Sequence, residues 1–325
     1  MTAPSCHQFC WSGRATLIAV PLQTFKTQRG RVTRVGFIVR LILVCSTSAP
    51  HAAADHVAKA WGVRWEPAKL INGSPILFKV VPPVRLESLT GTWLDHQVFF
   101  SFDPRNKLWF GIAGASLETP VGRFPLSLKG KTAAGQEVSF VQQLAIAKGR
   151  YRQVVLTVPK QFTEPTPEQR DEIRQEQELK HEVFARVDPK REWSGDFLPP
   201  VRASITDVFG TARVFNGSTQ SVHEGLDYGV PSNTPVVALN NGTVLLARPL
   251  FFEGNCVVLN HGQGLLTLYM HLSKMEVKEG DQVQRGQEIA LSGGTGRATG
   301  PHLHVAVRWQ GVYLNPATLL SLEIP

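Results

Sequence analysis

Short apolar segments separated by turn residues run through most of the chain, and they limit its fold more than any other feature. Between residues 73 and 158 the segments include "SPILFKVV", "KLWFGIA" and "RQVVLTV". Glycine, proline and asparagine stand between them, and these residues favour turns. Repeated short strands of this kind predict a small antiparallel β-sandwich over residues 60–160.

A second β-rich region begins near residue 191. Its apolar runs include "TPVVALNNGTVLLA", "NCVVLNH" and "GLLTLYMHL", with glycines between them. We expect five or more strands there and find no helical pattern between them. A chain of 325 residues is long enough for two domains. The predicted fold class is therefore all-β with two domains, the second of them over residues 195–325.

One segment, residues 165–190, has a clear helical start. Thr166 is suited to the N-cap, Pro167 to the first helical position, and Gln169 completes a capping-box pattern. Most of its face is charged and the apolar stripe is partial. We therefore predict a linker helix between the two β domains.

The first 54 residues resemble an export signal. They contain six Lys and Arg residues and no Asp or Glu, and the apolar run "VGFIVRLILV" precedes the small residues "CSTSAPHAAA". This pattern predicts cleavage after Ala54. The apolar run is shorter than the ~20 residues of a membrane span. We therefore expect an exported protein of the periplasm, cell envelope or cell exterior, without a stable membrane anchor.

The charge of the chain argues against nucleic acid as a partner. Its formal net charge is +8, but the six basic residues of the leader leave 28 basic and 26 acidic residues, a net charge of +2. No basic stripe runs along the remaining chain. The composition therefore gives no support to a polyanion-binding function.

Several residues that resemble reactive groups are assigned structural or surface roles. Cys256 lies in an apolar strand pattern, which favours a small buried side chain over a nucleophile. His181 begins an H-E-x-x-H pattern, but Ala185 stands where the second histidine is required. His96 is isolated, and His261 lies in a glycine-rich turn.

Five side chains of the second β region could share one site: His223, Asp227, His271, His302 and His304. His302 and His304 alternate with apolar residues, so they face the same side of a strand. His223 and Asp227 are expected to flank an irregular turn. Imidazole nitrogens and carboxylate oxygens are ligands that zinc prefers, commonly three with water in the fourth position. Spacing alone leaves open which three of the five would bind it.

Four motifs in this region carry a resemblance to a known family. They are "HEGLD", "YMHLS", the glycine loop "SGGTGRATG" and "GPHLHV". In this order and spacing, residues 204–317 resemble the lysostaphin/LytM-like zinc metallopeptidases, which cleave the peptide part of bacterial peptidoglycan. Residues 60–190 resemble the immunoglobulin-like β-sandwich domain that precedes the peptidase in some exported members.

The resemblance implies a role for each of the five residues. His223, Asp227 and His304 match the zinc ligands of the family, and His271 and His302 match the histidines that assist catalysis. All five residues are present. The glycine loop lacks the G-K-[ST] ending of a phosphate-binding loop, and we assign it to the turn before "HLHV".

The predicted function is a zinc-dependent endopeptidase, with one zinc ion, that hydrolyses amide bonds in peptidoglycan peptides during cell-wall remodelling. An alternative is a non-catalytic peptidoglycan-binding regulator that activates another hydrolase, although such relatives typically lose metal ligands. A third hypothesis is a secreted peptidase that acts on ordinary proteins or Gly-rich peptides instead of cell wall. The sequence does not indicate which bond is cleaved or how many copies of the chain associate.

Overall fold

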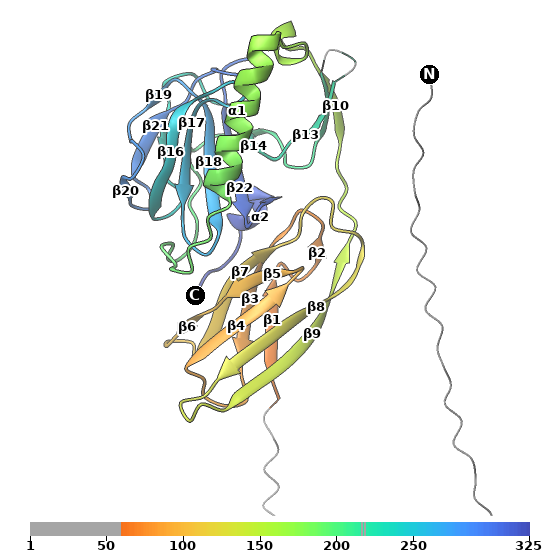
Figure 1. Cartoon of the computed structure of the whole chain (residues 1–325), viewed down its shortest axis with the longest axis vertical. Helices are drawn as coiled ribbons and strands as arrows, with labels where there is room; N and C mark the ends of the chain where they lie inside the picture. The colour runs from red at the N-terminus through yellow and green to blue at the C-terminus, as the bar shows by residue number, and fades with distance from the viewer. Residues whose placement is uncertain (1–59, 216, 218) are drawn as a thin grey trace, which may run out of the picture. The chain divides into compact units, whose positions relative to one another are not determined.

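The computed structural model describes residues 60–215, 217 and 219–325 (Figure 1). The predicted export signal and its cleavage after Ala54 lie outside these residues. Strands make up most of the regular structure, which confirms the all-β fold class. The helical elements of the described part are η1 (Lys160–Phe162), α1 (Pro167–Phe184) and α2 (Pro316–Leu319). None of the helices described has both the length and the apolar character needed to cross a bilayer.

Two sheets form the first β region. One has the order β1 (Gly62–Glu66), β3 (Pro75–Val81), β7 (Leu108–Gly114) and β6 (Ser101–Asp103). The other has the order β2 (Leu70–Ile71), β9 (Glu137–Ala147), β8 (Gly122–Lys131), β4 (Ser88–Trp93) and β5 (His96–Phe99). The strands of both sheets pair antiparallel except for β2 and β9, which pair in parallel. In β4, buried and exposed residues alternate, as expected for a strand with one face on the core. Trp93 of β4 donates a hydrogen bond from Nε1 to Gly114 O of β7 at 2.9 Å, which joins the two sheets.

The largest sheet lies in the second β region. Its order is β11 (Ile205–Asp207), β14 (Gly225–Tyr228), β22 (Leu303–Trp309), β18 (Leu265–Leu272), β17 (Gly254–Asn260), β16 (Gly242–Leu250) and β20 (Gln282–Val283), and β23 (Val312–Leu314) also pairs with β22. A smaller sheet has the order β15 (Pro235–Val237), β21 (Glu288–Leu291) and β19 (Lys274–Met275). Leu303, Val305 and Val307 of β22 point into the core beneath the large sheet.

A third group of strands joins the two regions. β10 (Gln153–Leu156) follows the first region and pairs in parallel with β12 (Ala212–Phe215), which pairs with β13 (Thr219–Val222). The partners in the parallel pair are far apart in sequence, as Gln153 opposite Ala212 illustrates. This arrangement brings the segment that follows the sandwich beside the second β region.

Helix α1 begins as predicted. The Thr166 side chain accepts a hydrogen bond from Gln169 N, and the Gln169 side chain accepts one from Thr166 N, which completes the capping box. At the other end, Phe184 is buried in an apolar cluster with Met270 and Ala306 of the large sheet. The helix therefore covers part of one face of that sheet (Figure 1).

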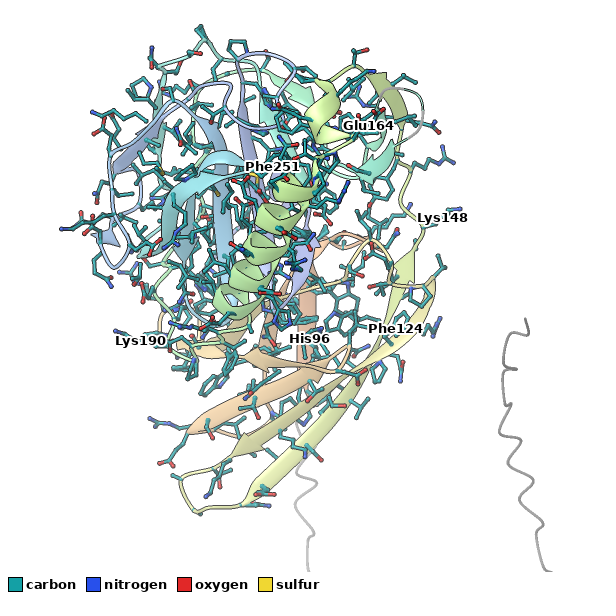
Figure 2. The ribbon with its side chains drawn as sticks, turned by 45° about the horizontal axis from the view of Figure 1, so that its top comes forward. His96, Phe124, Lys148, Glu164, Lys190 and Phe251 are labelled. Carbon is teal, nitrogen blue, oxygen red and sulfur yellow. The ribbon has the colours of Figure 1, made fainter. Side chains whose placement is uncertain are left out.

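Polar contacts hold the middle of α1 near the β16–β17 connection. The Glu176 carboxylate accepts a hydrogen bond from Phe251 N at 2.9 Å, and Figure 2 shows Phe251 beside the helix. Lys180 forms a salt bridge with Glu253 at 2.6 Å, and both side chains are mostly buried. The helix is thus attached by charged as well as apolar contacts.

The described residues belong to one compact unit. The main apolar core contains residues of both β regions, and Asn315 N donates to Gly73 O at 2.8 Å between them. The division into a sandwich at 60–160, a linker helix at 165–190 and a second domain at 195–325 stays a prediction. The immunoglobulin-like character of the first region likewise stays a prediction.

Candidate functional site

Two neighbouring strands place the first three candidate residues. Asp227 of β14 lies directly opposite His304 of β22 in an antiparallel pair. His223 precedes β14 and has the same parity as Asp227, so strand alternation brings its side chain to the same face. The expectation that His223 and Asp227 flank an irregular turn was therefore wrong for Asp227, because pairing with β22 draws that segment into the sheet.

The glycine in "HEGLD", Gly225, leaves the space in which the His304 side chain lies, where β14 pairs with β22. A Cβ atom on Gly225 would lie 2.4 Å from His304 Nε2 and 2.5 Å from Val305 O. Real Cβ atoms do not approach other atoms so closely, so any side chain here would displace the imidazole or the strand. The glycine is thus required by the close approach of His304.

Three donor atoms meet at this point. His223 Nε2 lies 3.0 Å from Asp227 Oδ1 and 3.0 Å from His304 Nδ1, and His304 Nδ1 lies 2.8 Å from Asp227 Oδ1. All three residues are buried. A tetrahedral zinc ion with bonds of ~2.0–2.1 Å separates its ligand atoms by roughly 3.3 Å. The triangle of donor atoms is close to that size, so these residues fit a metal ion.

The charges at the site also suit a metal ion. Burial alone would raise the pKa of Asp227, but its contacts with His223 and His304 outweigh it and hold the pKa well below its usual range. Burial lowers the pKa of His304, and Asp227 opposes only part of that effect. An ionised carboxylate beside a neutral imidazole is the protonation state in which these groups bind metals.

His271 reaches the site through a break in strand alternation. Leu266, Leu268 and Met270 face α1, so regular alternation would turn His271 into the core. The backbone at His271 instead has φ 61, in the left-handed region, and the next residue, Leu272, packs in the core. This local irregularity brings the His271 ring to the site, where its centroid lies 5.9 Å from that of the His304 ring.

Hydrogen bonds to backbone carbonyls orient the remaining pair of histidines. His271 Nδ1 donates to Thr295 O, and His302 Nδ1 donates to Gly300 O, each at 2.8 Å. A carbonyl can only accept, so Nδ1 of each ring carries a proton, and in the neutral imidazole Nε2 then keeps its lone pair. The two ring centroids lie 4.8 Å apart.

The two rings differ in depth. Burial lowers the pKa of His271 to about 3, so this imidazole is neutral at pH 7. His302 precedes β22 and forms an isolated bridge with Gly293, and its Nε2 lies 3.8 Å from Asp227 Oδ1. The prediction that His302 and His304 face the same side is confirmed, because both approach Asp227.

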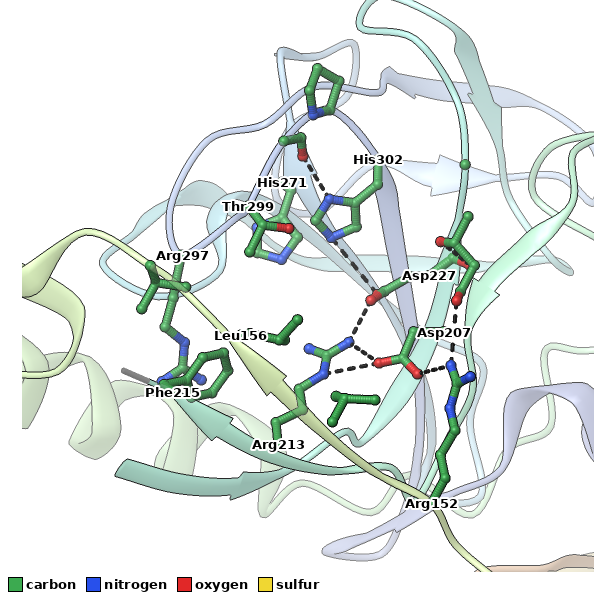
Figure 3. A pocket seen from close by; sticks show the side chains of 16 residues that line it. Arg152, Leu156, Asp207, Arg213, Phe215, Asp227, His271, Arg297, Thr299 and His302 are labelled. Atoms are coloured by element: carbon green, nitrogen blue, oxygen red, sulfur yellow. Dashed lines mark hydrogen bonds and ion pairs between the residues drawn. The ribbon is translucent and has the colours of Figure 1, made fainter. Parts of the chain in front are cut away.

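A cavity of about 470 Å³ opens beside these residues (Figure 3). Its walls include Asp227, His271 and His302 on one side and the β10 residues Val154 and Leu156 on the other. A smaller cavity of about 130 Å³ lies beside His223 and His304. The candidate site is thus part of a groove, and β10 contributes to its wall.

Sequence reasoning gave no role to two charged residues that contact the site. Arg213 donates from Nη2 to Asp227 Oδ2 at 2.5 Å, and it also binds Asp207, as Figure 3 shows. Both residues lie in "ITDVFGTARVFNG", within the stretch 204–317 that carries the family resemblance, but that resemblance assigned them no function. Their contact with the metal-ligand candidates depends on the folding of β11 and β12 beside β14, which spacing alone does not indicate.

The residues assigned structural roles lie away from this cluster or are fully buried. Cys256 is buried in the apolar cluster beneath α1, as predicted. His261 is buried, with Nδ1 donating to Asn241 O at 2.6 Å and Nε2 2.8 Å from Thr267 Oγ1, so its role is structural. His96 packs against Trp309. His181 is exposed on α1.

Comparison with known proteins identifies the second β region. Residues 221–316 match the model of peptidase family M23, which confirms the predicted resemblance to LytM-like peptidases. A solved structure from Pseudomonas aeruginosa assigned to peptidase M23 is 26% identical, with a TM-score of 0.59. The match covers 78% of this chain and 95% of that chain.

Curated relatives share a shorter region. The peptidoglycan DD-endopeptidase ShyA of Vibrio cholerae is 45% identical over 103 residues, which are 32% of this chain and 23% of the relative. The DD-carboxypeptidase/endopeptidase Mpg of Neisseria meningitidis is 38% identical over 121 residues, which are 37% of this chain and 28% of the relative. This chain thus matches about a quarter of the length of each.

Proposed function

We propose that this chain, whose residues 221–316 belong to peptidase family M23, is a zinc-dependent endopeptidase that hydrolyses amide bonds in peptidoglycan peptides. The observation that carries this proposal is the meeting of His223 Nε2, Asp227 Oδ1 and His304 Nδ1 within hydrogen-bond distance of one another. These three residues are the proposed zinc ligands. A zinc ion bound there would polarise the amide carbonyl and lower the pKa of a water molecule to about 7.

The proposed catalytic residues are His271 and His302. Because both rings carry their proton on Nδ1, each has an unprotonated Nε2. An imidazole in this state accepts a proton from the attacking water and returns it to the leaving amine. Once protonated, it donates a hydrogen bond to the developing oxyanion.

The proposed substrate class is supported by the relatives. ShyA is named a peptidoglycan DD-endopeptidase and Mpg a DD-carboxypeptidase/endopeptidase. The groove beside the histidines has room for an extended peptide, with a cavity of about 470 Å³. We propose that the protein acts on cell-wall peptide in the periplasm or the cell exterior after export, without nucleic acid as a partner.

The completeness of the site favours catalysis over the alternative of a metal-free regulator. Each of the five predicted residues is present, and their side chains lie in contact or near contact. A regulator would have no need of unprotonated Nε2 atoms beside a metal-ligand set. The third hypothesis, a peptidase for ordinary proteins, shares this site and differs only in substrate.

The proposal is tested with purified protein and isolated sacculi. Mass spectrometry of the soluble products should show peptide fragments with new amine and carboxyl ends. A chelator should abolish their release, and added zinc should restore it. Casein serves as the protein substrate for comparison. Cleavage of casein but not of sacculi would contradict the substrate class, and a folded protein that binds no zinc would favour the regulator.

A further inference from the structure

A single arginine, Arg213, bridges the carboxylates of Asp207 and Asp227 beside the proposed metal site. Arg213 Nη2 lies 2.5 Å from Asp227 Oδ2 and 2.6 Å from Asp207 Oδ2, and Arg213 Nε lies 3.0 Å from the latter. The opposite oxygen of Asp227, Oδ1, faces His223 and His304. The two carboxylate oxygens of Asp227 therefore have different partners, and Arg213 determines which oxygen faces the imidazoles.

Asp207 binds Arg213 and also lies next to His223, one of the proposed metal ligands. Its Oδ2 lies 3.3 Å from His223 Nδ1, the nitrogen that donates to Val208 O at 2.8 Å. Its Oδ1 accepts hydrogen bonds from Thr211 Oγ1 and Val208 N, each at 2.9 Å. These contacts fix the Asp207 carboxylate, so Arg213 is held against a rigid acceptor.

Both residues come from strands outside the region that matches the family model. Asp207 ends β11 and lies opposite Asp227 of β14, and Arg213 lies in β12. The family match begins at residue 221. The side chains of Arg213, Asp207 and Asp227 are only 16%, 14% and 9% exposed, so solvent screens their interactions weakly.

We propose that Arg213 and Asp207 are positioning residues of the metal site. Arg213 holds Asp227 so that one oxygen alone is directed at the metal, and Asp207 holds Arg213 and fixes the ring of His223. Partners that orient ligands in this way commonly change metal affinity by about 10- to 100-fold. The inference rests on the proposed function only for the presence of a metal ion.

Another role for Arg213 would give different results. Arg213 lines both cavities of the groove, so its guanidinium could contact a substrate instead of positioning a ligand. Loss of a substrate contact would raise KM and leave metal affinity unchanged. Loss of positioning would weaken metal binding in the absence of substrate.

The experiment measures zinc affinity without substrate, by competition with a chromophoric chelator. The variants are Arg213→Gln, Arg213→Lys and Asp207→Asn, made in the full chain. We expect Arg213→Gln to bind zinc about 10- to 100-fold more weakly than wild type. Arg213→Lys keeps the charge but not the forked geometry, so its zinc affinity should lie between that of wild type and that of Arg213→Gln. Asp207→Asn should also bind zinc more weakly.

Arg248→Gln is the matched control. Arg248 binds Glu279 through Nε and Nη2, the same atoms that Arg213 uses, but it lies on β16 of the large sheet, to which β12 does not belong, and outside both site cavities. Its zinc affinity should equal that of wild type. The absorption spectrum of the cobalt-loaded protein gives a second readout, since altered ligand orientation changes the visible bands of Arg213→Gln and not those of Arg248→Gln.

The outcomes separate this inference from the proposed function. Wild-type zinc affinity and an unchanged cobalt spectrum in Arg213→Gln and Asp207→Asn would overturn the positioning role, and a raised KM would then assign Arg213 to the substrate. Absence of zinc binding in the wild-type protein itself would instead contradict the proposed function. If Arg213→Gln does not fold, Arg213→Lys and Asp207→Asn decide the question.

Discussion

Backbone carbonyls determine the tautomers of the histidines at the site. His223, His271 and His302 each donate from Nδ1 to a carbonyl oxygen at 2.8 Å. In the neutral form of each ring, Nε2 is consequently the nitrogen with the free lone pair. For His223 that atom faces Asp227 and His304, where a ligand is needed. Single-residue changes should therefore separate metal binding from proton transfer.

His302→Ala and His304→Ala should give different losses. His304 supplies one of the three proposed ligand atoms, so His304→Ala should lose both zinc and hydrolysis of sacculi. His302 approaches Asp227 only to 3.8 Å, so His302→Ala should keep zinc and lose activity by about 10²- to 10⁴-fold. Elemental analysis and product release from sacculi measure the two effects. Full activity in either variant would contradict its assigned role.

His261 should make stability depend on pH independently of the site. Burial lowers the pKa of His261 from 6.5 to about 4. As pH falls below 6.5, the unfolded chain takes up a proton at His261 that the folded protein does not. Stability present above pH 6.5 is therefore lost as pH falls towards 4. The loss attributable to His261 between pH 6.5 and pH 5 is about 2 kcal/mol.

The comparison uses His261→Gln, which cannot titrate. Urea unfolding at pH 7 and pH 5, in the presence of chelator, gives the free energy of unfolding of each variant. The decrease between the two pH values should be smaller in His261→Gln than in wild type by about 2 kcal/mol. His181→Gln, at an exposed position on α1, should retain the wild-type decrease. Equal decreases in all three proteins would refute the assignment.

At the scale of strands, the site depends on two departures from regular β geometry. The first is the left-handed backbone of His271, which directs a side chain to the ligand face instead of the core. The second is the close packing of β14 against β22 at Gly225, where no Cβ fits. Both departures lie in strands whose other residues pack in the core. The packing of the sheet therefore holds the backbone at His271 and at Gly225 in place.

Gly225→Ala tests the second departure. The added Cβ meets His304 Nε2 at 2.4 Å, so the imidazole must move or the strands must separate. We expect a loss of zinc affinity and a destabilisation of about 1–3 kcal/mol, as for overpacked cores. Chelator competition and urea unfolding measure the two effects. Gly62→Ala in β1, whose Cβ has only ordinary contacts, should change neither quantity. Wild-type affinity in Gly225→Ala would show that the close approach is dispensable.

At the scale of the whole molecule, the sequence predicted what depends on local pattern. The capping box of Thr166 and Gln169 fixed the start of α1, and period-2 alternation placed His302 and His304 on one face. The sequence did not predict which distant strands pair with each other. The parallel pairing of β10 with β12 depends on contacts between remote segments that no short motif encodes. The contact of Arg213 with Asp227 depends on how β12 folds beside β14, which the spacing of the two residues does not indicate.

Zinc should stabilise the molecule as a whole, because its proposed ligands come from segments far apart in the chain. Asp227 and His304 are separated by 77 residues, so a bound ion links β14 to β22 and is released on unfolding. A ligand at ~1,000 times its Kd stabilises a protein by about 4 kcal/mol, which corresponds to a rise in Tm of roughly 10 °C for a chain of this size. Calorimetry of apo-protein with and without zinc measures that rise. His304→Ala should lose it and His181→Ala should keep it; a similar rise in His304→Ala would place the stabilising metal elsewhere.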